Sequence, residues 1–97
     1  GSWGPARTCP PGERLVSFRL RVEPSQGVFD DAGATDMAAT CSKGQQLEGG
    51  GLQRGDWGQW SEWCPPACGI CGVRTRVETP GTSDDTGLTD LRLYCCD

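Results

Sequence analysis

Apolar and polar residues alternate along residues 16–22 and again along residues 73–77. Alternation with a period of two predicts β-strands that bury one face and expose the other. A further strand is expected at the end of each half, around residues 37–41 and 91–95. The expected inward positions are Val16, Phe18, Leu20, Val22, Met37, Ala39, Cys41, Val73, Thr75, Val77, Leu91, Leu93 and Cys95. No stretch of helical length keeps a 3.6-residue period, so the pattern predicts an all-β fold of antiparallel sheets without substantial helix.

These strands lie in a sequence repeat. RLRVEP at 19–24 recurs as RTRVET at 74–79, and DDAGATDMAATC at 30–41 recurs as DDTGLTDLRLYC at 84–95. A Trp-Gly pair precedes each copy, at Trp3-Gly4 and Trp57-Gly58. We therefore expect a single domain, residues 1–97, built from two repeats at 2–42 and 56–97 that a Gly-rich linker at 43–55 joins.

Seven cysteines in a chain of 97 residues, of which 35% are apolar, indicate a disulfide-bonded protein of an oxidising compartment. Such a short chain with little apolar content needs covalent links to hold its fold. Repeat symmetry suggests the pairs Cys9–Cys41 and Cys64–Cys95, so that Cys71 would pair with Cys96 and Cys68 would be left over. The exchanged pairing, Cys64–Cys96 with Cys71–Cys95, stays open because connectivity does not follow from sequence.

Composition also excludes several classes of function. The chain has no histidine, which rules out histidine-based catalytic triads and histidine-containing zinc sites. Its net charge of -4 argues against nucleic-acid binding, and no apolar run is long enough for a membrane-spanning helix. Cys68-Gly-Ile-Cys71 together with Cys95-Cys96 could form a four-thiolate zinc site, but an oxidising compartment favours disulfides. We expect neither a metal nor a cofactor.

The longest motifs are CPPGERLVSFRLRVEPSQG in the first half, and WGQW before Cys64, CGVRTRVE and DDTGLTDLRLYCCD in the second. They resemble the vitelline membrane outer layer protein family over nearly the whole chain. The resemblance implies a β-prism, in which three Greek-key sheets surround a pseudo-threefold axis, and a secreted protein of egg coats or other extracellular secretions with a glycan-related activity. This chain carries two of the three repeats and lacks the first, so its sheets would form an open wedge or a second chain would fill the gap.

A second departure from the family concerns Asp36 and Asp90, which stand where the family usually has an asparagine after its DDT motif. If that asparagine bonds to its own backbone in a turn, aspartate can replace it. If the asparagine binds a ligand, the resemblance does not carry that function over.

Two motifs are candidate binding sites. Trp57, Trp60 and Trp63 before Cys64, with Arg74 and Arg76 at alternate positions, resemble the start of a thrombospondin type 1 repeat, which stacks Trp on Arg and binds glycosaminoglycans. The interpretation we favour is that these Trp residues seal one end of a sheet, because aromatic side chains bury large areas.

The second candidate is the RGD tripeptide Arg54-Gly55-Asp56, followed by Trp57, in a linker expected to be exposed. It could bind an integrin, although so short a motif also occurs by chance.

The acid pairs Asp30-Asp31 and Asp84-Asp85 are weak catalytic candidates, since two carboxylates in a groove can cleave or transfer sugars. Acids in turns more often bond to backbone N–H groups, and one active site needs no duplicate. We therefore expect a secreted, non-catalytic structural protein of an extracellular coat that contacts matrix or glycans. The alternative is an effector in venom or saliva that binds a channel or, through residues 54–56, an integrin. A chito-oligosaccharide transferase or hydrolase ranks third, and a homodimer could form through Cys68 or the missing sheet.

Overall fold

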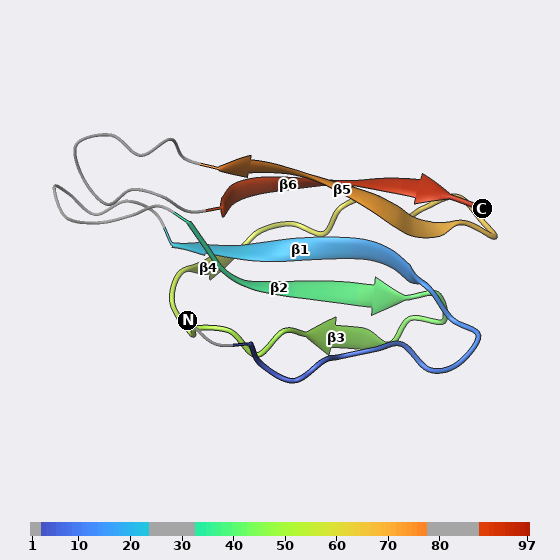
Figure 1. Cartoon of the computed structure of the whole chain (residues 1–97), viewed down its shortest axis with the longest axis horizontal. Helices are drawn as coiled ribbons and strands as arrows, with labels where there is room; N and C mark the ends of the chain where they lie inside the picture. The colour runs from blue at the N-terminus through green and yellow to red at the C-terminus, as the bar shows by residue number, and fades with distance from the viewer. Residues whose placement is uncertain (1–2, 24–32, 78–87) are drawn as a thin grey trace, which may run out of the picture.

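A computed structural model of the chain describes residues 3–23, 33–77 and 88–97 (Figure 1). These residues form β-strands and no helix, as the periodicity predicts. It follows that the described residues include no helix that could span a membrane. The strands are β1 (Leu15–Glu23), β2 (Gly33–Cys41), β3 (Gln46–Glu48), β4 (Asp56–Trp57), β5 (Gly69–Val77) and β6 (Leu88–Cys96).

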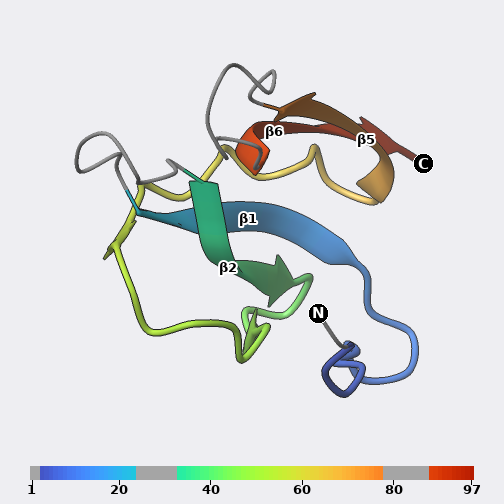
Figure 2. The ribbon, with the colours of Figure 1, turned by 60° about the vertical axis from the view of Figure 1, so that its left-hand side comes forward.

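The strands form two antiparallel sheets. The first has the order β3-β2-β1-β4, and the second is the hairpin β5-β6. Figures 1 and 2 show the second hairpin as a separate layer that runs along β1. The two sheets of one chain therefore lie face to face.

The two hairpins have the same strand register. Leu15 lies opposite Cys41 in the first hairpin, and Ile70, its repeat counterpart, lies opposite Cys95 in the second. The register shifts after Leu15 and Arg21 in the first hairpin, and after the equivalent residues in the second. Bulges at equivalent places indicate that the repeated residues impose the same local backbone path twice.

Disulfides close both hairpins at matching positions. Cys9–Cys41 and Cys64–Cys95 join segments whose Cα atoms are 5.8 and 5.7 Å apart, within the usual range for a disulfide. Cys71 pairs with Cys96, and Cys68 is the free, half-buried cysteine. These are the pairs that repeat symmetry suggests, and the exchanged pairing is not present.

The expectation of one buried face per strand is wrong for the first hairpin. Val16 and Ser17 point to opposite faces of β1, yet they are only 5% and 1% exposed. On β2, Ala38 and Thr40 are buried as well as the expected Ala39 and Cys41. The first hairpin is more covered than expected because β5 and β6 contact β1 and β2, and because Cys9–Cys41 ties the N-terminal segment to the end of β2.

The inward placement expected for Val73 is also wrong. Val73 is 61% exposed, although its repeat counterpart Phe18 is half-buried. Phe18 lines the space between the two sheets, whereas Val73 does not line it. The core therefore lies in the first sheet.

The Gly-rich stretch at 43–55 is not a free linker. It contains β3, which pairs with β2, and the amide of Leu52 donates a hydrogen bond to the Thr35 carbonyl (3.0 Å). Gly51 and Gly55 pack so closely on the carbonyl oxygens of Thr35 and Val22 that a Cβ at either position would clash. Glycine allows this stretch to lie directly against the first sheet.

Candidate functional site

An arginine of β1 lies between two tryptophan rings. The Arg19 guanidinium is 4.5 Å from the ring centroid of Trp57 and 4.8 Å from that of Trp60. Arg21 approaches Trp57 more loosely, at 5.9 Å. These distances are typical of cation–π contacts, which are strongest where water is excluded.

Backbone hydrogen bonds to β1 hold the tryptophan segment in place. The amides of Gly58, Ser61 and Cys64 donate to the carbonyls of Leu20, Phe18 and Val16 at 2.8, 2.8 and 2.9 Å. The Ser61 hydroxyl in turn accepts a hydrogen bond from the Phe18 amide (3.0 Å). Residues 58–64 thus follow the outer edge of β1 and continue the short strand β4.

The second repeat supplies the rings and the first repeat supplies the cations. The thrombospondin-like interpretation had instead placed Arg74 and Arg76, on β5, with these rings. Sequence analysis missed Arg19 and Arg21, although RLR at 19–21 matches RTR at 74–76 and offered the same signal. Because Arg19 is half-buried between the rings, this stack stabilises the junction between the repeats and leaves little of its aromatic surface for a ligand.

The other two tryptophans have exposed rings. Trp63 is 56% exposed beside the groove between the two sheets. Trp3 is fully exposed, so its ring does not repeat the packing of its counterpart Trp57. The expectation that the tryptophans seal a sheet therefore holds only for Trp57 and Trp60.

Arg74 has a different environment from Arg19. It lies directly opposite Arg92 in the β5–β6 pair, and Tyr94 follows on the same face of β6. All three side chains are exposed. Hydrogen bonding by the Arg74 guanidinium lowers the pKa of Tyr94 below its usual value, a change that desolvation opposes and a hydrogen bond from Arg92 reinforces.

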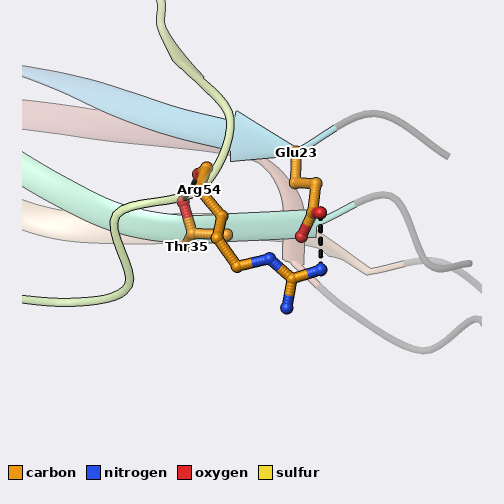
Figure 3. A network of polar contacts seen from close by, with 3 residues as sticks. All are labelled: Glu23, Thr35 and Arg54. Atoms are coloured by element: carbon orange, nitrogen blue, oxygen red, sulfur yellow. Dashed lines mark hydrogen bonds and ion pairs between the residues drawn. The ribbon is translucent and has the colours of Figure 1, made fainter. Parts of the chain in front are cut away.

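The RGD tripeptide is attached to the edge of the first sheet. The Arg54 guanidinium donates to Glu23 at 2.7 Å, and the Thr35 hydroxyl donates to the Arg54 carbonyl at 2.6 Å (Figure 3). Arg21 donates to the Gly55 carbonyl at 3.0 Å, and Asp56 pairs with Val22 as part of β4. Arg54 and Asp56 are exposed as expected, but their backbone is held within the sheet.

The acid pairs Asp30-Asp31 and Asp84-Asp85 lie outside the described residues. Asp36 and Asp90, the two departures from the family's asparagine, have equivalent roles in the two hairpins. Each accepts a hydrogen bond from the amide of the next residue, at 2.7 Å in both cases. Aspartate therefore supplies the local backbone bond that an asparagine would make. Within the described part of the chain, no three acidic or cysteine side chains gather into a metal site.

A groove of about 920 Å³ separates the two sheets. Apolar residues of both sheets line it: Val16 and Phe18 from β1, and Ile70, Leu91 and Leu93 from the second hairpin. The other residues that line the groove include Glu62, Arg74, Arg76, Asp90 and Arg92, together with Trp63. The groove thus offers apolar surface, one exposed indole and a mixed set of charges that favours the positive sign.

Comparison with known proteins identifies the family of the chain. Residues 1–97 match the family described as "Vitelline membrane outer layer protein I (VOMI)". The chain is 45% identical over 97 residues to the "Vitelline membrane outer layer protein 1 homolog" of Mus musculus, and 43% identical to that of Homo sapiens. Each comparison covers 99% of this chain and 47% of the relative, so the chain spans about half the length of these curated relatives. Because the family match covers the whole chain, the protein belongs to the vitelline membrane outer layer protein I family.

Proposed function

We propose that the protein is a secreted, non-catalytic structural component of an extracellular coat or secretion, where it associates with glycans. The observation that carries this proposal is the pair of equivalent disulfides, Cys9–Cys41 and Cys64–Cys95, one closing each hairpin. Disulfides persist in extracellular compartments and reduce the entropy of the unfolded chain. A protein of this build resists unfolding and proteolysis outside the cell.

The environment of the candidate residues also supports a structural role. Trp57 and Trp60 stack on Arg19, and the RGD backbone is bonded to β1 and β2. These residues stabilise the junction between the repeats. Arg74 and Trp63 remain at the surface, beside a groove where a sugar could lie.

Co-sedimentation with insoluble extracellular coat material tests the proposal. We expect the oxidised protein to pellet with the coat and to survive added protease, and the reduced protein to be digested. A soluble globular protein of similar size and charge is the control for trapping in the pellet. If the oxidised protein stays in the supernatant, the coat role is wrong.

Two further assays separate the alternatives. Release of product from a chito-oligosaccharide, lost in the Asp84→Asn variant, would show an enzyme instead of a coat component. Cell adhesion that disappears in the Asp56→Glu variant would show an integrin ligand. We expect no such adhesion, since the backbone of Gly55 and Asp56 is held within the first sheet. We also expect no release of product, since one active site needs no duplicate acid pair.

A further inference from the structure

Two arginines lie side by side on the exposed face of the second hairpin. Arg74 and Arg92 are directly opposite each other in the β5–β6 register, and both are exposed. Like charges at directly opposed positions of an antiparallel pair destabilise a sheet. The arrangement therefore carries a cost, which a bound anion would remove.

The first hairpin lacks this arrangement, although its backbone register is the same. Arg19, the counterpart of Arg74, lies opposite Ala38 and between two tryptophan rings. Within the described chain no tryptophan ring stacks on Arg74. The second repeat therefore has a charge cluster that the architecture of the fold does not require.

Tyr94 lies beside the two arginines, two residues along β6 from Arg92 and on the same face. Hydrogen bonding by Arg74 is the main cause that lowers the pKa of its phenol, and Arg92 adds to the effect. Two cationic groups from neighbouring strands thus stabilise negative charge at this place. An oxyanion accepts such bonds about twice as strongly as a neutral group, so a sulfate or carboxylate would compete well for these donors.

The neighbouring charges also favour an anion. Arg76 lies two residues along β5 from Arg74, opposite Asp90. The Asp90 carboxylate accepts a hydrogen bond from the Leu91 amide. Glu62 is the other acidic residue that lines the groove between the sheets. Three arginines, Arg74, Arg76 and Arg92, therefore stand against two carboxylates in its lining.

We propose that Arg74, Arg92 and Tyr94 form a binding site for the sulfate ester or carboxylate of an acidic glycan. The site rests on the proposed association with glycans and names the chemistry of the sugar. Arg74 and Arg92 also border the groove that Trp63 lines, and the exposed ring of Trp63 provides an apolar surface for a neighbouring sugar.

Calorimetric titration of the disulfide-bonded chain with three oligosaccharides tests the site. The probes are a heparin hexasaccharide, which carries sulfates, a hyaluronan hexasaccharide, which carries only carboxylates, and neutral chitohexaose. We expect one or both acidic probes to bind more tightly than chitohexaose. Arg74→Ala and Arg92→Ala should each weaken the binding about fivefold or more, as expected for one lost charge-assisted hydrogen bond at an exposed site.

The matched control is Arg7→Ala, which removes the same charge from an exposed position in the N-terminal segment. It should change the affinity by no more than about twofold, because a distant surface charge acts weakly and is screened by salt. Equal weakening by Arg7→Ala and Arg74→Ala would show attraction to overall charge and would overturn the site.

Tyr94 gives a second measurement that needs no variant. It is the only tyrosine of the chain, so the absorbance of tyrosinate reports this phenol alone. A bound anion takes the guanidinium bonds from the phenol, and we expect saturating acidic probe to raise the pKa of Tyr94. An unchanged pKa under saturation would place the ligand elsewhere.

The outcomes separate this site from the proposed function. If the protein pellets with coat material but does not prefer the acidic probes, only this site is overturned. If the protein does not pellet with coat material, the proposed function is overturned.

Discussion

One of the contacts that join the two repeats consists of three side chains. Arg19 lies between Trp57 and Trp60, and both tryptophans come at least 38 positions after the arginine in the chain (19 to 57). Each cation–π contact contributes about 0.5–2 kcal/mol, depending on how well water is excluded. The arginine stem also fills the space between the rings, so its loss affects packing as well as charge.

Replacement of Arg19 by alanine should therefore destabilise the fold by about 1–3 kcal/mol, because it removes two ring contacts and leaves a gap between the rings. Urea unfolding followed by tryptophan fluorescence measures the change. Arg7→Ala is the control, since Arg7 is exposed and should cost less than about 0.5 kcal/mol. Equal effects of the two variants would contradict the structural role of the stack.

At the scale of elements, the two hairpins were largely predictable, but the packing of the linker was not. Alternation and repetition are local patterns, and they located both strand pairs and indicated their equivalence. Most residues of the linker are exposed, as expected, but its glycines do not mark a flexible turn. Its glycines have a different cause, since Gly51 and Gly55 allow the backbone to approach the carbonyls of β2 and β1.

Gly55 combines a close contact with a left-handed backbone. Its φ is 89°, and a Cβ at this position would clash with the Val22 carbonyl. Gly55→Ala should destabilise the protein by at least about 2 kcal/mol, through backbone strain and displacement of β4. Thermal unfolding monitored by circular dichroism measures this loss.

Gly44→Ala separates strain from contact. Gly44 also has a positive φ, 98°, but nothing lies within 4 Å of its Cβ position. We expect it to cost about 1 kcal/mol, the strain alone. A cost at Gly44 that equals the cost at Gly55 would show that the linker does not pack on the sheet as described.

At the scale of the whole molecule, burial is unequal between two repeats of similar sequence. Val16, Leu20, Ala38, Ala39 and Cys41 of the first hairpin are buried, whereas Val73 of the second is mostly exposed. A small core of this kind provides modest stability, so the disulfides carry a large share of it.

Removal of the first disulfide, by Cys9→Ser together with Cys41→Ser, should cost about 2–5 kcal/mol because it releases a loop with a sequence separation of 32 residues. Because Cys41 is fully buried, its replacement also disturbs the packing around it and adds to the loss of stability. Cys68→Ser is the control, because Cys68 is the free cysteine, and it should change the stability by less than about 1 kcal/mol.

Denaturant unfolding compares these variants, and peptide mapping without reductant reports the bonds. The map should join Cys64 to Cys95 and Cys71 to Cys96. A fragment that joins Cys64 to Cys96 would contradict the connectivity and the equivalence of the two closures.

The sequence by itself determined the class of fold, the duplication and the places of the four long strands, but not the short strands β3 and β4. These features follow from period-two alternation and from matching segments, both of which can be read without knowing any contact. Tertiary structure alone decided that Arg19 and not Arg74 meets the tryptophans, that Ser17 and Thr40 are buried, and that the glycine-rich segment lies on the sheet. Each of these features depends on which distant segments of the chain lie side by side. Similar local patterns in the two repeats can therefore have different neighbours.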